Sequence, residues 1–219
     1  SDTVAYNIDF IKAKTPVMAF DETKKQLTIT CATTDAKIFY TIGGTTPSAT
    51  SIEYTGALTL TDNREIKAIA ISSDCLNSSV ASYKPTYFAC APVTVEYDGR
   101  SVKFACTTEG AAIYYTTNGY TPSDDSDKYD GNAVILDGIS TVKAVAIKSN
   151  LNNATVTFEP TAYYNGGKTY VTKAGDLEKA YKWCGKEKII DVSIEGSLNA
   201  TDITTIKGMK AAKYLDLSN

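Results

Sequence analysis

The stretch of sequence that decides the fold occurs twice in the chain. Residues 31–56 read CATTDAKIFYTIGGTTPSATSIEYTG, and residues 106–131 read CTTEGAAIYYTTNGYTPSDDSDKYDG. The two stretches align without a gap, at positions 75 apart. After one inserted residue, IKAIAI at 66–71 falls on VKAVAI at 142–147. Self-similarity over this length predicts two tandem copies of one domain.

Apolar and polar residues alternate within each copy, which is typical of antiparallel strands with one solvated face. The apolar positions are Leu27, Ile29 and Cys31 in the first copy, and Val102, Phe104 and Cys106 in the second. Upstream of these strands, Pro16-Val17 falls on Pro92-Val93. Turn dipeptides follow the next strand in both copies, Gly43-Gly44 and Asn118-Gly119. Short strands separated by turns predict a β-sandwich for each copy.

The shared pattern resembles a known family. The motif I-Y-Y-T-x-x-G-x-x-P-S, followed by Y-x-G and (I/V)-K-A-x-A-I, is similar to the chitobiase/β-hexosaminidase C-terminal domain, also called a fibronectin-III-associated repeat. The resemblance covers about residues 15–160. It implies a small immunoglobulin-like fold and a role as an accessory module in secreted bacterial enzymes and surface proteins.

The last 55 residues change character. Leu177, Ala180, Tyr181 and Cys184 have helical spacing. We expect strands at 189–194 and 214–218, with a short helix over 203–209 after N-cap residues at 199–202. The L-x-x-L-x-L frames of the two strands lie 23 residues apart, within the leucine-rich-repeat range of about 20–29. This segment resembles the start of a leucine-rich-repeat array of a bacterial surface protein, and we expect further repeats after residue 219.

The expected fold is therefore mainly β: two tandem immunoglobulin-like β-sandwiches and a small C-terminal α/β segment that resembles the N-terminal end of a leucine-rich-repeat array. Residues 1–14 are interpreted as a leading strand, either the end of a preceding repeat or a strand that pairs with the first copy. The first sandwich is expected over 15–87, the second over 88–164, and the truncated α/β segment over 165–219.

Composition excludes several classes of function. The 22 Lys and Arg against 25 Asp and Glu give a net charge of −3, so the chain as a whole has no electrostatic reason to bind nucleic acid. There is no histidine, which removes Ser-His-Asp catalysis and His-ligated zinc. No GxSxG, Walker A or GxGxxG motif occurs, and no apolar run is long enough for a membrane span. We expect no enzyme activity and no cofactor.

Two tyrosines are candidate ligand-binding residues. Tyr114 lies on the expected outer face of its strand, and Tyr120 lies in the turn that follows. Aromatic side chains on a flat outer face can stack on sugar rings. The alternative explanation is that tyrosine simply suits an exposed strand or an interdomain contact.

The densest acidic loop offers a candidate calcium site. Asp124, Asp125 and Asp127 are closely spaced carboxylates, which Ca²⁺ accepts as ligands. The loop lacks the EF-hand spacing, and the first copy has Ser48-Ala49-Thr50-Ser51-Ile52 in its place. A solvated turn is the alternative explanation.

The five cysteines cannot all pair within one chain. Cys31 and Cys106, on apolar strand faces, are predicted to be buried and reduced. Cys75 and Cys90 flank the junction between the copies and are candidates for a disulfide, although spacing alone does not fix connectivity. Cys184 is expected to pack on its helix.

The sequence predicts a non-catalytic fragment of a secreted or outer-surface bacterial protein, with lipid anchoring through an upstream segment as one route to the surface. The immunoglobulin-like modules would form a stalk, and the leucine-rich repeats would bind a host or microbial surface protein or a glycan. The alternative is a pair of carbohydrate-binding accessory modules from a glycan-degrading enzyme. Both expectations rest on resemblance of fold.

Overall fold

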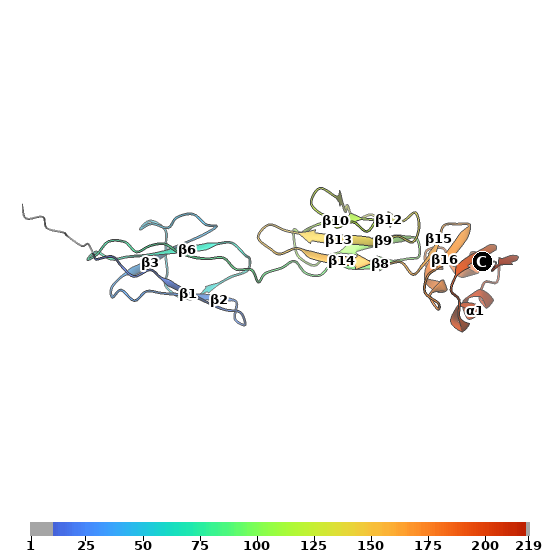
Figure 1. Cartoon of the computed structure of the whole chain (residues 1–219), viewed down its shortest axis with the longest axis horizontal. Coiled ribbons are helices and arrows are strands. Elements are labelled where there is room, and N and C mark those ends of the chain that lie inside the picture. Colours follow the sequence, from blue (N-terminus) through green and yellow to red (C-terminus); the bar gives the residue numbers. More distant parts are fainter. Residues whose placement is uncertain (1–10, 218–219) are drawn as a thin grey trace, which may run out of the picture. The chain divides into compact units, whose positions relative to one another are not determined.

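The computed structural model describes residues 11–217 and is mainly β (Figure 1). Two compact units make up the chain. Unit 1 holds the residues up to Ala89 together with Ser149–Asn152, and unit 2 holds Cys90–Lys148 and the residues from Asn153 onward. Within the described part, no helix has the length and apolar character needed to cross a lipid bilayer.

The first repeat consists of two antiparallel sheets, with strand orders β1-β2-β5 and β4-β3-β6-β7. The strands are β1 (Val17–Asp21), β2 (Gln26–Thr30), β3 (Lys37–Ile42), β4 (Ile52–Glu53), β5 (Leu58–Thr59), β6 (Ile66–Ile71) and β7 (Ala81–Tyr83). Their inward side chains form one core, with Leu27, Ile29, Tyr40, Leu60, Ile66 and Ala68 buried. The alternation expected for β2 is therefore confirmed.

The second repeat has the same topology, with strand orders β12-β9-β8 and β11-β10-β13-β14. The strands are β8 (Thr94–Tyr97), β9 (Ser101–Ala105), β10 (Ala112–Thr116), β11 (Asp127–Lys128), β12 (Val134–Ile135), β13 (Val142–Ile147) and β14 (Ala154–Phe158). Strand β9 repeats the burial pattern of β2, and β13 repeats that of β6. The two copies predicted from the sequence are two separate pairs of sheets.

The strand register corrects one detail of the sequence alignment. Val17 pairs with Thr30, and Thr94 pairs with Ala105, which is the counterpart of Thr30. Val17 therefore corresponds to Thr94 and not to Val93. The first hairpin leaves residues 22–25 between its paired strands, whereas in the second Asp98 N–H donates to Ser101 O and only Gly99-Arg100 lies between. This shortening was not visible in the sequence comparison.

Residues that both copies share build the loop after β3 and β10. A strand-end threonine donates to a carbonyl of that loop, and a serine hydroxyl accepts a backbone N–H within it. The threonine bonds are Thr41 to Thr45 O and Thr116 to Tyr120 O; the serine bonds are Ser48 N to Ser51 Oγ and Ser123 N to Ser126 Oγ. The threonine and serine residues that the two copies share thus stabilise the loop in which they lie.

The C-terminal segment forms a fifth sheet, which is mixed and has the order β15-β16-β17-β18. The elements are β15 (Ala162–Tyr164), β16 (Lys168–Val171), η1 (Leu177–Tyr181), η2 (Lys186–Lys188), β17 (Asp191–Gly196), α1 (Ala200–Lys207) and β18 (Tyr214–Asp216). The first pair is antiparallel, and β16, β17 and β18 are parallel. Strand β15, which the sequence placed in the second sandwich, pairs with this sheet.

The local predictions for this segment hold in most places. Asn199 caps α1 with a capping box, and Leu177, Ala180 and Tyr181 are buried, although they lie on a 3-10 turn and not on an α-helix. The sequence also predicts that Leu215 and Leu217 are inward residues of a strand that forms an exposed edge of its sheet. The edge position is confirmed, but the inward placement of the two leucines is wrong. They are 49% and 45% exposed, because β18 is the last strand of the sheet in the described part of the chain and lies at its edge.

The segment before the first repeat pairs with that repeat. Lys12 forms a parallel bridge to Leu76, and Ala13 N–H donates to Leu76 O at 2.9 Å. The end of the first repeat makes the same contacts, between Ala89 and Asn152, so both interpretations of the leading segment stay predictions. The part of the predicted leading strand before residue 11 lies outside the described residues.

Candidate functional site

The two candidate tyrosines of the second repeat lie in different settings. Tyr114 is half-buried on β10, opposite Lys128 on one side and Val145 on the other. Tyr120 is 74% exposed in the loop that follows. Within residues 11–217, no contact between aromatic rings joins Tyr114 to Tyr120. A sugar-stacking role for them stays a prediction.

The acidic loop is built by serine hydroxyls. Ser126 Oγ accepts Ser123 N–H, and Ser123 Oγ accepts Asp125 N–H. The carboxylates of Asp124, Asp125 and Asp127 belong to exposed residues. Among the described residues, no group of three or more Asp, Glu or Cys side chains is placed to hold a metal ion. The loop has the same hydrogen bonds as its uncharged counterpart in the first repeat, so its conformation needs no cation.

No disulfide joins any of the five cysteines within the described residues. Cys31 and Cys106 are half-buried, so the prediction that they are buried is wrong in degree. They lie one residue beyond β2 and β9, where each thiol donates to a main-chain carbonyl at 3.2 Å, of Lys14 and Ala91 respectively. Cys75 belongs to unit 1 and Cys90 to unit 2, and their pairing stays a prediction.

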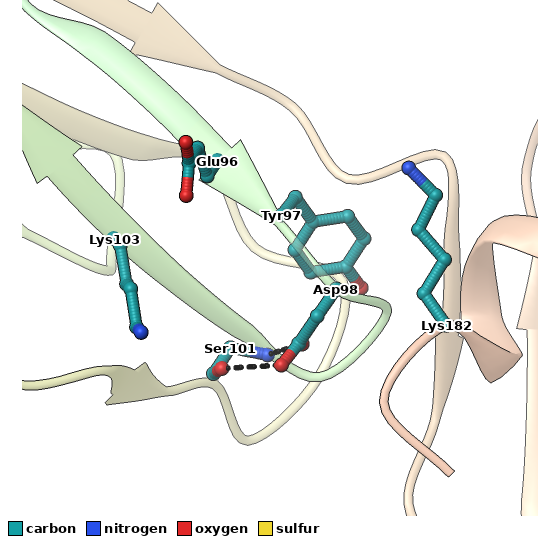
Figure 2. Close-up of a pocket in the computed structure, with 6 residues that line it drawn as sticks. All are labelled: Glu96, Tyr97, Asp98, Ser101, Lys103 and Lys182. Atoms are coloured by element: carbon teal, nitrogen blue, oxygen red, sulfur yellow. Dashed lines mark hydrogen bonds between the residues drawn. The ribbon is translucent and has the colours of Figure 1, made fainter. Parts of the chain in front are cut away.

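A shallow groove lies where the second repeat meets the C-terminal segment, inside unit 2. One pocket of about 220 Å³ is lined by Glu96, Tyr97, Asp98, Ser101, Lys103 and Lys182 (Figure 2). A second, of about 280 Å³, shares Tyr97 and Lys182 and adds Phe158, Glu159, Thr161 and Lys179. Lys179 and Lys182 come from the C-terminal segment, so the groove exists only when both parts are together.

The carboxylate of Asp98 is committed to its own turn. It accepts Arg100 N–H at 2.9 Å, Ser101 N–H at 2.7 Å and the Ser101 hydroxyl at 2.9 Å. Figure 2 shows the two bonds from Ser101, which hold Asp98 below the ring of Tyr97. A carboxylate used in this way shapes the hairpin and is not a free base for catalysis.

Tyr97 connects the two parts of unit 2. Its hydroxyl donates to Ala162 O at 2.7 Å, and its ring packs on Phe158 with the centroids 5.2 Å apart. Burial, with the nearby Asp98 carboxylate, raises the pKa of Tyr97, so the hydroxyl stays protonated and keeps donating. Tyr97 is therefore a structural strut at the base of the groove.

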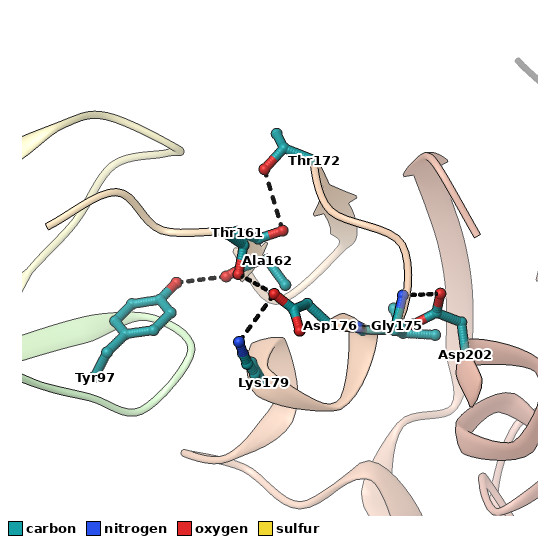
Figure 3. A network of polar contacts seen from close by, with 9 residues as sticks. Tyr97, Thr161, Ala162, Thr172, Gly175, Asp176, Lys179 and Asp202 are labelled. Carbon is teal, nitrogen blue, oxygen red and sulfur yellow. Dashed lines mark hydrogen bonds and ion pairs between the residues drawn. The ribbon is translucent and has the colours of Figure 1, made fainter. Parts of the chain in front are cut away.

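A chain of polar contacts continues from this strut into the C-terminal segment (Figure 3). Thr161 donates to the Asp176 carboxylate at 2.6 Å, and Lys179 pairs with the same carboxylate at 2.9 Å. Burial would raise the pKa of Asp176, but these two contacts outweigh it and lower the pKa. The ammonium of Lys179 is thus paired with Asp176. Lys182, the other groove lysine of the C-terminal segment, forms no ion pair within the described residues.

Asp202 ties the helix α1 to the turn before η1. Its side chain is fully buried and accepts the N–H groups of Gly175 at 2.6 Å, Leu177 at 2.9 Å and Asn199 at 2.9 Å. Three backbone donors explain why a charged side chain is stable there. The sequence showed Asp202 only as part of an N-cap cluster, and nothing in its spacing revealed the contact with residues 175–177.

The sequence reasoning also missed the groove itself, because its residues come from strands and turns far apart in the chain. The strand register, and not the sequence alignment, supplies one signal. The hairpin of the second repeat reads Tyr97-Asp98-Gly99-Arg100 where the first repeat has a turn longer by two residues. In this chain the shortened hairpin is a place where the second repeat meets the C-terminal segment.

Comparisons with known proteins support the two repeats. Residues 27–84 match the family model described as Fn3 associated, and residues 92–159 match the one described as chitobiase/beta-hexosaminidase C-terminal domain. The chain thus contains two tandem immunoglobulin-like repeats similar to these families, and the matched part of the hexosaminidase-like family is an accessory domain that is non-catalytic by itself. Neither match extends into the last 60 residues.

One similar solved structure is titled "Crystal structure of the S-layer protein SbsC, domains 7, 8 and 9". It is 11% identical to this chain, with a TM-score of 0.25, over 67% of this chain. The chain spans 61% of the length of that structure. In the comparison with curated proteins, none matches this chain.

Proposed function

We propose that this chain is a non-catalytic part of a secreted or outer-surface bacterial protein. The two repeats form a stalk, and the C-terminal segment begins a leucine-rich-repeat array that recognises a partner, either a surface protein or a glycan. The observation that carries the proposal is the attachment of the C-terminal mixed sheet to the second repeat, through Tyr97, inside one compact unit.

The use of the shared residues supports the stalk. Thr41, Ser48 and Ser51 and their counterparts in the second repeat hold a loop, and the shared apolar residues fill a core. A site for a common ligand would need shared exposed side chains, and Tyr120 corresponds to Thr45 in the first repeat. The residues that the two repeats share therefore stabilise the fold, as expected for a spacer.

The geometry of the last sheet supports the array. Val192 on β17 pairs in register with Leu215 on β18, 23 residues later, and both strands are parallel. Helix α1 connects them, as in a repeat that alternates strand and helix. Tyr214 is 73% exposed and Leu215 49%, so the outer strand presents apolar side chains that a further layer or a partner would cover.

The state of the titratable groups supports a non-catalytic role. The Asp98 and Asp202 carboxylates are saturated with backbone donors, and the Asp176 carboxylate is paired with Lys179. The tyrosines with the strongest burial, Tyr97 and Tyr181, have raised pKa values and stay neutral near pH 7. We expect no turnover of glycosides, esters or peptides by this chain.

The proposal has two parts, and each has its own test. If the protein lies on the outer surface, protease treatment of intact cells should remove the repeats. If the protein is secreted, the repeats should be present in the medium. A glycan array probed with the chain should show no binding that depends on the repeats. Repeats that stay protected inside intact cells would contradict the surface role.

A second candidate function is a pair of carbohydrate-binding accessory modules. The match of residues 92–159 to a hexosaminidase C-terminal domain favours it, as does the groove beside Tyr97, which combines an aromatic base with hydroxyl, carboxylate and ammonium groups. Specific glycan binding that is lost in Lys182→Ala, and retained in the matched surface variant Lys188→Ala, would favour this function over the first.

A further inference from the structure

The two repeats end in linkers that align without a gap but lead to different followers. Residues 84–89, KPTYFA, align without a gap with residues 159–164, EPTAYY. The first linker leads into another sandwich, and the second leads into the mixed sheet of the C-terminal segment. The two linkers share a Pro-Thr pair but differ at their last three residues, so the choice of follower depends on these residues and on the rest of each repeat.

The hairpin between β8 and β9 touches the follower of the second repeat, as does Leu136 after β12, whose carbonyl accepts the Tyr163 hydroxyl. Gly99 O accepts Tyr164 N–H, and the guanidinium of Arg100 lies 4.9 Å from the ring centroid of Trp183. Trp183 in turn stacks on Tyr164. The hairpin thus contacts β15 through the Gly99 carbonyl and the Tyr97 hydroxyl. It contacts the turn after η1 through the guanidinium of Arg100.

Gly99 permits the closest of these approaches. It is buried, with φ at +103°, and a Cβ placed on it would lie 2.5 Å from the carbonyl carbon and oxygen of Ala180. Such a contact would force η1 away from the hairpin. Glycine is therefore required twice at this position, by its backbone conformation and by the neighbouring main chain.

The hairpin of the first repeat has the same anchor but a different tip. Asp21 accepts Thr23 N–H and Lys24 N–H, as Asp98 accepts Arg100 N–H and Ser101 N–H. Its tip, residues 22–25, is longer by two residues and contains no glycine. The strut also differs, because Tyr97 corresponds in register to Phe20, which has no hydroxyl.

We propose that the β8–β9 hairpin is a docking socket for the C-terminal segment, and that its short Gly99 tip and the Tyr97 hydroxyl select this segment as the follower of the second repeat. The partner surface is β15 together with η1. The socket specifies which repeat carries the α/β segment, independently of what that segment binds.

Exchange of the hairpins tests the socket in the full chain. Replacing residues 98–101 with residues 21–26 of the first repeat should undock the C-terminal segment. The only tryptophan, Trp183, reports docking. We expect its emission to shift to the red and its quenching by acrylamide to rise, and we expect faster amide exchange at Ala162–Tyr164. Unchanged emission and exchange would overturn the proposal.

Two matched glycine-to-alanine variants separate the effect of the contact between residue 99 and Ala180 from the effect of backbone strain. Gly99→Ala and Gly110→Ala both place a Cβ at positive φ in the second repeat, but Gly110 has open space around it. We expect undocking in Gly99→Ala alone, with amide protection of β13 retained. Equal effects of the two substitutions would overturn the role of the contact.

A third variant covers the case in which the hairpin exchange unfolds the repeat. Tyr97→Phe keeps the ring and removes the hydroxyl that reaches Ala162 O, and so copies Phe20 of the first repeat. Faster exchange at Ala162–Tyr164 with unchanged exchange in β13 supports the socket. Parent-like exchange at Ala162–Tyr164 overturns the selective role of the hydroxyl.

Discussion

At the scale of single residues, buried polar groups with complete sets of partners hold unit 2 together. The side chain of Asp202 has no exposed surface and accepts three backbone N–H groups. Thr169 and Tyr181 share a hydrogen bond of 2.6 Å in the core of the C-terminal segment. Removing one partner from such a group leaves the others buried and unsatisfied, which costs more than the bond itself contributes.

The first prediction concerns Asp202. In Asp202→Asn the amide nitrogen takes the place of one carboxylate oxygen and faces a backbone N–H group. Loss of one or two accepted bonds should lower the free energy of unfolding by roughly 1–3 kcal/mol. Urea unfolding followed by Trp183 fluorescence measures it. The control is Asp125→Asn on the exposed loop, and an equal loss in both variants would contradict this role of Asp202.

The second prediction concerns high pH. Burial raises the pKa of Tyr181 from 10.0 to about 12. The folded state therefore keeps a proton that the unfolded state releases, so this stability is complete below pH 10 and is lost as the pH rises toward 12. Thermal unfolding between these values should depend less on pH in Tyr181→Phe than in the parent chain. The exposed Tyr120→Phe should behave like the parent, and identical slopes in all three would contradict the prediction.

At the scale of elements, neighbouring strands of one sheet differ sharply in what their side chains contribute. Ile194 on β17 is 3% exposed and belongs to the core of the C-terminal segment. Leu215 on β18 is 49% exposed, although its strand pairs directly with β17. The edge strand therefore adds hydrogen bonds to the sheet but buries little apolar surface.

The third prediction follows from this difference. Ile194→Ala should lower the free energy of unfolding by about 2–5 kcal/mol, because it leaves a cavity in the core. Leu215→Ala, on the exposed edge, should stay within about 0.5 kcal/mol of the parent chain. Urea unfolding of the two variants side by side measures both. Comparable losses would show that Leu215 is buried in solution, by self-association or by another element.

The elements show what the sequence can reveal and where it stops. Alternation in residues 26–30 and the capping residue Asn199 act locally, and both were predicted correctly. The position of Leu215 and the docking role of Gly99 depend on which element lies beside them, and periodicity carries no such information. The half-buried Cys31 is an intermediate case, because its face was correct but the strand ends one residue earlier.

At the scale of the whole molecule, the organisation follows from one domain that occurs twice and from the places where the two copies differ. Two copies of a sandwich keep the same strands and the same loop hydrogen bonds. The second copy has a shorter hairpin between β8 and β9 than the first has between β1 and β2, and that hairpin meets the C-terminal segment. The function proposed here depends on this joint, because a recognition surface is held in place only if the joint is rigid.

Native-state hydrogen exchange of the unaltered chain tests this claim most directly. Amides of β13, β16 and η1 should reach one common opening free energy as sub-denaturing urea is added, because they belong to one cooperative unit. Amides of β6, in unit 1, should follow a separate isotherm. If β16 and η1 instead open at a much lower free energy than β13, the C-terminal segment is not carried by the second repeat as one body, and the account is contradicted.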